Sequence, residues 1–169
     1  MKKPKLVVLT GYPTCGKSRV SKFLAQNLGY TRISGDEISI ELFGHTYPYT
    51  DDENPERIWE TIYKRRDEGL TEGRNVVIDT TAYDEQRRKR LFNARIPADK
   101  YLVWLQVNPE TMNRRTRERK WTENSIEQWK NFVGWEDPKQ NDYRLLVYQN
   151  NDPEDLETIK NDLRKQMKN

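Results

Sequence analysis

Residues 11–18 read Gly-Tyr-Pro-Thr-Cys-Gly-Lys-Ser, which matches the pattern G-x-x-x-x-G-K-[ST]. An apolar run, Leu-Val-Val-Leu at residues 6–9, precedes this segment, and a stretch with helical periodicity follows it. A strand, a glycine-rich turn and a helix in this order are typical of a phosphate-binding P-loop. The glycines let the backbone fold around a phosphate, and the N–H groups at the helix start face the anion. The segment therefore predicts binding of a nucleoside triphosphate; a glycine turn with a purely structural role is the alternative.

Two side chains of this loop have expected chemical roles. Lys17 is expected to reach the β- and γ-phosphates of ATP, and the Ser18 hydroxyl is expected to ligate Mg²⁺. Cys15 is the only cysteine, which excludes an intramolecular disulfide, and it is more simply a small residue at a variable position than a reactive thiol. The residues expected to bind the nucleotide are Gly11, Tyr12, Pro13, Thr14, Cys15, Gly16, Lys17, Ser18 and Arg19.

The composition favours one cytoplasmic domain over the whole chain, 1–169. Hydrophobic and charged residues each make up 34% of the sequence, and the net charge of +3 is too small to require a nucleic-acid partner. No apolar stretch has the length of a membrane span, and no signal peptide is visible. The length is also short for a typical AAA⁺ motor with its helical lid.

Strand and helix patterns alternate along the chain, which predicts an α/β fold with a parallel sheet. Strands are expected at residues 5–9, 30–34, 75–79, 101–107 and 144–148, and helices at 17–28, 36–43, 55–70, 84–94, 109–120, 125–132 and from 153 to the end. The expected fold is a P-loop NTPase three-layer sandwich with a five-stranded parallel sheet and an arginine-rich helical lid at about 114–135.

Two aspartates follow predicted strands. Residues 76–79 read Val-Val-Ile-Asp, a pattern that places Asp79 near the P-loop metal, since ligands bind at the carboxyl ends of parallel strands. Asp36 follows the second strand and is a candidate base for the proton of an acceptor hydroxyl. Either carboxylate could instead cap a helix. Glu37 is the rival base, although one residue further along it should point elsewhere.

Two basic runs have both functional and structural interpretations. Residues 114–120 read Arg-Arg-Thr-Arg-Glu-Arg-Lys, which suits a mobile lid that folds over a triphosphate, or a solvated helix face. Residues 87–90 read Arg-Arg-Lys-Arg and could follow a nucleic-acid backbone or form a charged helix face. Trp121 could stack on a base or pack on the domain. Residues 80–82, Thr-Thr-Ala, lack the D-x-x-G of a GTPase, and no N-K-x-D occurs.

The order of these elements, from the P-loop through Asp36 and Asp79 to the second basic run, resembles the polynucleotide-kinase-like P-loop kinases. This family includes phage 5′-hydroxyl polynucleotide kinase, seryl-tRNA(Sec) kinase and zeta toxins, and the resemblance spans roughly residues 5–150. It implies that Asp36 is the general base and that Arg115 and Arg119 are the lid arginines. The arginine that holds the acceptor phosphate in the polynucleotide kinases is missing here, where residues 38–40 read Ile-Ser-Ile.

Together, these features predict an ATP-dependent, Mg²⁺-dependent kinase that phosphorylates a hydroxyl group. The catalytic residues are expected to be Lys17, Asp36, Arg115 and Arg119, and the metal ligands Ser18 and Asp79. The two basic runs favour a nucleic-acid acceptor, RNA or DNA, of the 5′-hydroxyl or tRNA type. A small-molecule kinase and a non-kinase nucleotide switch are the alternatives, and the oligomeric state is left open.

Overall fold

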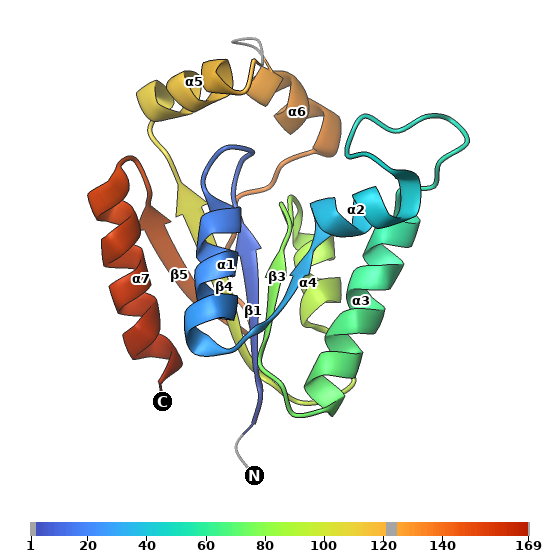
Figure 1. The fold of residues 1–169 in the computed structure, drawn as a ribbon, viewed down its shortest axis with the longest axis vertical. Helices are drawn as coiled ribbons and strands as arrows, with labels where there is room; N and C mark the ends of the chain where they lie inside the picture. Colours follow the sequence, from blue (N-terminus) through green and yellow to red (C-terminus); the bar gives the residue numbers. More distant parts are fainter. Residues whose placement is uncertain (1–2, 121–124, 169) are drawn as a thin grey trace.

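The computed structural model describes residues 3–120 and 125–168. Within them, five strands form one sheet in the order β2-β3-β1-β4-β5, and every strand pair is parallel, as predicted (Figure 1). The strands are β1 (Lys5–Thr10), β2 (Thr31–Ser34), β3 (Val76–Asp79), β4 (Asp99–Gln106) and β5 (Arg144–Gln149). The helices are α1 (Lys17–Leu28), α2 (Gly35–Phe43), α3 (Glu56–Thr71), α4 (Glu85–Phe92), α5 (Pro109–Glu118), α6 (Ser125–Val133) and α7 (Pro153–Met167).

Helices cover both faces of the sheet, which confirms the predicted three-layer sandwich. One face packs against α3 and α4 around Ile62 and Leu91, and the other packs against α1 and α7 around Leu24 and Ile159. All residues of β1 and β3 are buried, because central strands of a parallel sheet are covered on both faces. This burial explains why both strands are apolar runs rather than alternating patterns.

The register of the strands brings the predicted site residues to one edge of the sheet. Asp79 of β3 lies opposite Leu9 of β1 and opposite Ser34 of β2. The P-loop, the start of α2 and the end of β3 therefore leave the sheet at the same level. Ligand sites of open α/β sheets form at this carboxyl edge.

Polar caps set several helix starts, which is why the sequence located them well. The side chains of Ser34, Asp84, Asn108 and Asp152 each accept a hydrogen bond from a backbone N–H in the first turn of the helix that follows. Several boundaries differ from the prediction by one or two residues; for example, β4 begins at Asp99 rather than at residue 101. The Asp99 N–H donates to the Pro4 carbonyl, a contact with a distant segment that local sequence does not reveal.

Helices α5 and α6 lie across the carboxyl edge of the sheet, above the P-loop (Figure 1). They occupy the segment predicted as a lid. The possible base-stacking residue Trp121 lies outside the described residues. Among the helices that the structure describes, none is long and apolar enough to cross a membrane.

Candidate active site

The P-loop, residues 11–18, makes a tight turn. Gly11 and Gly16 have φ values of 145° and 97°, a region that favours glycine. A Cβ at Gly11 would lie 2.5 Å from the Leu105 carbonyl oxygen, and one at Gly16 would collide with the Asn150 side chain. Thr14 also has a positive φ, 74°, which is uncommon for a residue with a branched side chain. The loop therefore holds a strained conformation that its packing enforces.

Lys17 lies at the centre of this loop, where the motif predicts it. Its side chain is buried, and Nζ donates hydrogen bonds of 2.9 Å to the carbonyl oxygens of Gly11 and Tyr12. An ammonium group has three N–H donors, and these two carbonyls accept two of them, which fixes the position of the Lys17 charge. A phosphate bound in the loop would compete with the same carbonyls for Nζ.

Asn150 supports the P-loop from the end of β5, and sequence analysis missed it. Its side chain is 3% exposed, and Nδ2 donates a 2.8 Å hydrogen bond to the Cys15 carbonyl. Its backbone N–H donates to Gln106, which fixes the start of the loop after β5. A single asparagine after a strand has no sequence signature, so only the fold shows this contact.

Asp79 is buried and firmly oriented. Its Oδ2 accepts hydrogen bonds from Ser21 Oγ at 2.7 Å and from the Arg32 guanidinium at 2.8 Å. Its Oδ1 makes no hydrogen bond with a described residue. The Asp79 side chain is thus an anchored carboxylate at the carboxyl edge of the sheet, and it caps no helix.

Asp36 lies on the first turn of α2, but Ser34 is the residue that caps this helix. The Asp36 carboxylate is exposed and has no hydrogen bond or ion pair with the residues that the structure describes. Desolvation by the surrounding protein and repulsion from Asp79 raise its pKa, whereas the nearby charges of Lys17 and Arg119 act in the opposite direction. Asp36 therefore lies close enough to Asp79, Lys17 and Arg119 for their charges to affect its pKa.

The rival base, Glu37, is engaged elsewhere. It forms an ion pair with Arg32, the residue that also holds Asp79. The ion pair occupies the Glu37 carboxylate, whereas the Asp36 carboxylate pairs with no described residue. The structure thus distinguishes Asp36 from Glu37 by their partners. The sequence alone indicated only that Glu37 should point in another direction.

The oxygen atoms around Ser18 suit a magnesium ion. Ser18 is exposed, and its hydroxyl makes no hydrogen bond with a described residue. Ser21 Oγ donates its single proton to Asp79 Oδ2 at 2.7 Å and also lies 3.1 Å from the Ser18 carbonyl oxygen, so the residues of the two predicted ligands meet at one side chain. Mg²⁺ takes one or two protein oxygens and completes its shell with water and phosphate. No group of three acidic, histidine or cysteine side chains that could hold a metal occurs within residues 3–120 and 125–168.

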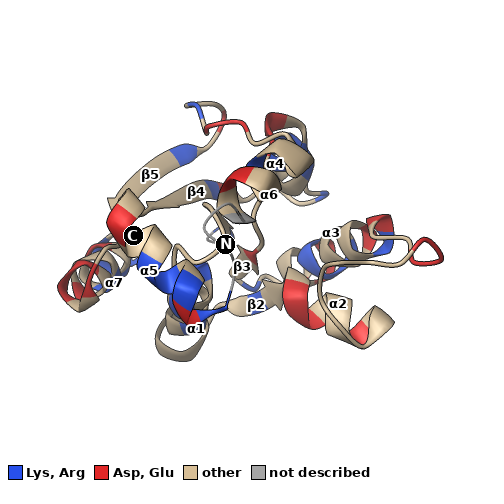
Figure 2. Ribbon diagram, turned by 90° about the horizontal axis from the view of Figure 1, so that it is seen from above, with Lys and Arg blue, Asp and Glu red and all other residues tan. Residues whose placement is uncertain are grey.

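Of the two predicted lid arginines, Arg115 contacts the P-loop and Arg119 lies near Asp36. Arg115 donates a 3.2 Å hydrogen bond to the Thr14 carbonyl, and burial together with Arg114 and Arg19 lowers its pKa. Arg119 ends the helix close enough to Asp36 to affect its pKa. Seen from above, basic positions of α5 lie over α1 (Figure 2). This concentration of positive charge suits a bound polyphosphate.

Aromatic side chains join the lid to the P-loop, a second feature that the sequence did not indicate. The ring of Tyr12 lies 4.7 Å from that of Trp135 and 6.4 Å from that of Trp129, and Lys130 Nζ lies 5.2 Å from the Tyr12 ring. Sequence gives the aromatic residues but not which of them meet. The contacts position α6 over the second residue of the loop.

The cations of the basic run at residues 87–90 are engaged with neighbouring residues. Arg87 pairs with Glu56 and stacks on Trp59 at 4.5 Å. Arg90 lies 3.9 Å from the same glutamate. These contacts tie α4 to α3 and neutralise much of the charge.

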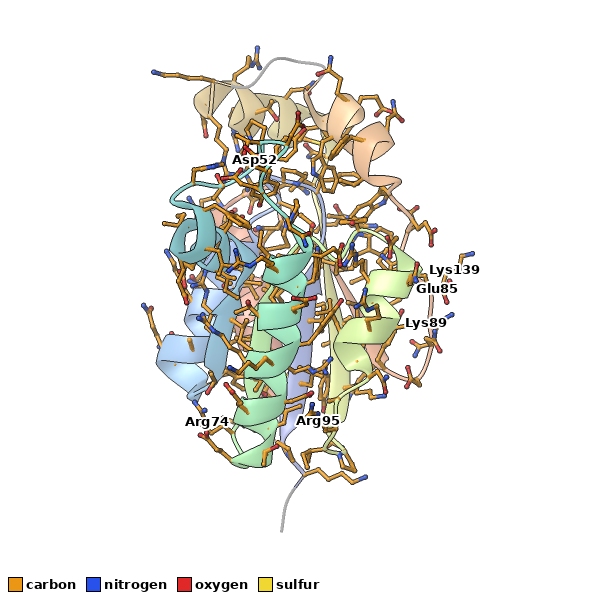
Figure 3. The ribbon with its side chains drawn as sticks, turned by 90° about the vertical axis from the view of Figure 1, so that its right-hand side faces the viewer. Asp52, Arg74, Glu85, Lys89, Arg95 and Lys139 are labelled. Atoms are coloured by element: carbon orange, nitrogen blue, oxygen red, sulfur yellow. The ribbon has the colours of Figure 1, made fainter. Side chains whose placement is uncertain are left out.

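The remaining members of this run are also engaged. Arg88 is only 1% exposed and donates to the Ala82 carbonyl, while Lys89 pairs with Glu85 one turn earlier (Figure 3). The structure therefore supports a charged, mostly paired helix face. It removes one of the two observations that favoured a nucleic-acid acceptor.

Sheet order and site define a P-loop kinase fold. The chain belongs to the family described as an AAA domain (AAA_33), whose match covers residues 6–133.

Solved structures of low sequence identity share the fold. A candidate kinase from Chloroflexus aurantiacus has a TM-score of 0.75 at 21% identity, with 99% of this chain and 97% of that chain covered. A sugar kinase from Janibacter sp. has a TM-score of 0.70 at 17% identity, with 95% and 93% covered. In the Pnkp1/Rnl/Hen1 RNA repair complex, a TM-score of 0.63 at 23% identity accompanies coverage of 76% of this chain and 43% of that chain.

Proposed function

We propose that this protein is an ATP-dependent phosphotransferase that moves the γ-phosphate to a hydroxyl group. The observation that carries the proposal is Asp36, a carboxylate without a described partner, within electrostatic reach of Lys17 and Arg119. A nucleotide switch needs the P-loop but has no need for such a base beside it. Residues 1–169 would form one kinase domain, with the lid at about 114–135.

The proposed reaction is an in-line displacement at the γ-phosphorus. The acceptor oxygen forms a bond to phosphorus as the bond to the β,γ-bridging oxygen breaks, and ADP leaves with that electron pair. Asp36 accepts the hydroxyl proton at a carboxylate oxygen. Lys17 and the P-loop N–H groups hold the β- and γ-phosphates, and Arg115 and Arg119 stabilise the charge on the transferring group. Ser18 and Asp79 would hold Mg²⁺, which neutralises phosphate charge when bound.

We propose a small hydroxyl compound as the first candidate acceptor. The run at 87–90 is paired internally, and the position of the acceptor-phosphate arginine is taken by apolar Ile38, by Ser39 and by Ile40. Ser39 is buried and its hydroxyl donates to the His45 carbonyl, so this hydroxyl is already engaged within the protein.

A nucleic-acid acceptor is the second candidate, in line with the resemblance to polynucleotide-kinase-like enzymes. The specific observation in its favour is the lid: Arg117, Arg119 and Lys120 are exposed, and none of them forms an ion pair with a described residue. These cations could contact a phosphate backbone next to the active site.

The test is a transfer assay with [γ-³²P]ATP. A panel of sugars, polyols, nucleosides, 5′-hydroxyl oligonucleotides and tRNA is incubated with the protein and Mg²⁺, and labelled products are separated. A labelled hydroxyl compound supports the kinase, and its chemical class decides between the two acceptors. ATP that binds but labels no acceptor would favour the switch protein.

A further inference from the structure

Arg32, in β2, uses all three of its guanidinium nitrogens in contacts with residues at or beside the proposed metal site. Nε donates to Ser21 Oγ at 2.7 Å, one terminal nitrogen donates to Asp79 Oδ2 at 2.8 Å, and the other pairs with Glu37. Its side chain is 13% exposed and that of Asp79 is 6% exposed. Neither motif analysis nor the proposed reaction assigns a role to this arginine.

We propose that Arg32 is a positioning residue that fixes the Asp79 carboxylate for magnesium. This inference rests on the proposed role of Asp79. With Oδ2 held by both Arg32 and Ser21, Oδ1 is the oxygen that remains for the metal or its water. The same guanidinium holds Glu37, so Asp36 alone stays available to the acceptor.

The physical reason lies in the freedom of a carboxylate. The terminal torsion of aspartate is broad and roughly two-fold, so packing alone does not choose which oxygen faces the site. Two donors on one oxygen remove that freedom, and the planar arginine fork supplies its donors in fixed directions. Ser21 also donates to Asp79 and accepts from Arg32, so each of these three side chains contacts the other two.

The experiment compares Arg32→Gln with Asp79→Asn and with the double variant. Binding of ATP is measured by calorimetry, first in EDTA and then across a Mg²⁺ titration, so that the readout does not depend on turnover. Arg74→Gln is the matched control, because Arg74 reaches β2 only through Thr31 and pairs with Glu72. Circular dichroism and thermal unfolding establish that each variant is folded.

We expect Arg32→Gln and Asp79→Asn each to raise the Mg²⁺ concentration for half-maximal enhancement at least fivefold. ATP affinity in EDTA should stay within twofold of wild type, and the double variant should lose no more than Asp79→Asn alone, because the two residues act through one carboxylate. The control should titrate like wild type.

Two results would overturn the inference in distinguishable ways. If Asp79→Asn shifts the Mg²⁺ dependence and folded Arg32→Gln does not, the positioning role is wrong while the metal site stands. If Asp79→Asn itself has no effect, the proposed metal role fails and the inference fails with it. Should Arg32→Gln not fold, Ser21→Ala removes the other donor, and it must then shift the Mg²⁺ dependence in the same direction.

Discussion

At the scale of single residues, two neighbouring carboxylates have opposite surroundings. Asp79 is buried and held by a cation, whereas Asp36 is exposed, lacks a described partner and has a raised pKa. Environments that separate two acids in this way are typical of sites with divided roles. The arrangement suits Asp79 to a fixed position beside the P-loop and Asp36 to proton transfer.

The raised pKa of Asp36 predicts a cost in stability. The folded protein binds this proton more tightly than the unfolded chain, whose ordinary value is 3.8, so the ionised carboxylate destabilises the fold above the raised pKa. The cost disappears as the pH falls below the unfolded value. We therefore expect Asp36→Asn to unfold at a higher temperature than wild type at pH 7, with a difference that shrinks toward pH 4.

The control is Glu37→Gln, which removes the ion pair with Arg32 and should bring no stabilisation. Thermal unfolding followed by circular dichroism at several pH values measures both variants. A wild-type protein more stable than Asp36→Asn at pH 7 would show that the carboxylate is not under electrostatic strain.

Lys17→Ala should weaken ATP binding at least tenfold while the fold persists. The ammonium now bonds two loop carbonyls, and its charge-assisted bonds to phosphate would contribute about 1.5–3 kcal/mol each. Calorimetric titration with ATP measures the effect. Lys22→Ala, on an exposed position of the same helix, is the control and should bind ATP as wild type does. Equal ATP affinity of folded Lys17→Ala would contradict a phosphate-binding role.

At this scale the sequence predicted the motif residues and missed their supports. Lys17 stands in the P-loop motif, and Asp36 and Asp79 stand at or just after a strand end. Arg32 and Asn150 act through contacts between segments 47 and 135 residues apart, respectively, and such contacts leave no local pattern.

At the scale of elements, the P-loop depends on the strand at the sheet edge. The Asn150 side chain connects the end of β5 to the middle of the loop. The close approach of Gly16 to this side chain leaves no room for a Cβ. Correct geometry of the loop is thus a property of two elements, β1 and β5.

Asn150→Ala should therefore lower the free energy of unfolding by about 1–3 kcal/mol, since it leaves the buried Cys15 carbonyl without its partner. ATP affinity should fall as well. Urea unfolding and calorimetry measure the two effects. Gln149→Ala, which removes an exposed side-chain contact next to it, should cost within about 0.5 kcal/mol. Equal effects of the two changes would argue that Asn150 does not support the loop.

The elements themselves were well predicted from sequence, because caps and apolar runs are local signals. Each strand was placed within two residues of its observed bounds, and α5 begins at Pro109 as expected. The packing of Trp129 of α6, and of Trp135 just after this helix, on Tyr12 was not predicted, since aromatic residues show no preference for one distant partner over another.

At the scale of the whole molecule, the two basic runs differ in how many of their cations are free to contact a ligand. The cations of residues 87–90 are paired or buried beside α3, whereas those at the end of α5 are exposed above the site (Figure 2). Net charge from the sequence could not show this difference, because pairing depends on the packing of α3 against α4.

The pairing predicts which cations affect binding of a single-stranded 5′-hydroxyl oligonucleotide. Arg87→Gln should leave the salt dependence of the affinity unchanged, although it should lower stability by removing the contacts with Glu56 and Trp59. Arg117→Gln should reduce the log–log slope by about 0.7 if a lid cation contacts a phosphate. Fluorescence anisotropy at several salt concentrations measures the slopes. A shallower slope for Arg87→Gln would restore the basic run as a nucleic-acid surface.

The central claim, that Asp36 accepts the proton during γ-phosphate transfer to a hydroxyl, is tested most directly by measuring that transfer. Wild type and Asp36→Asn are compared under single-turnover conditions with [γ-³²P]ATP and the acceptor panel, and ATP affinity is measured in parallel. The proposal predicts a labelled hydroxyl product, formed about 10²–10⁴-fold more slowly by Asp36→Asn, with ATP affinity nearly unchanged. A labelled product formed by Asp36→Asn at the wild-type rate would contradict it.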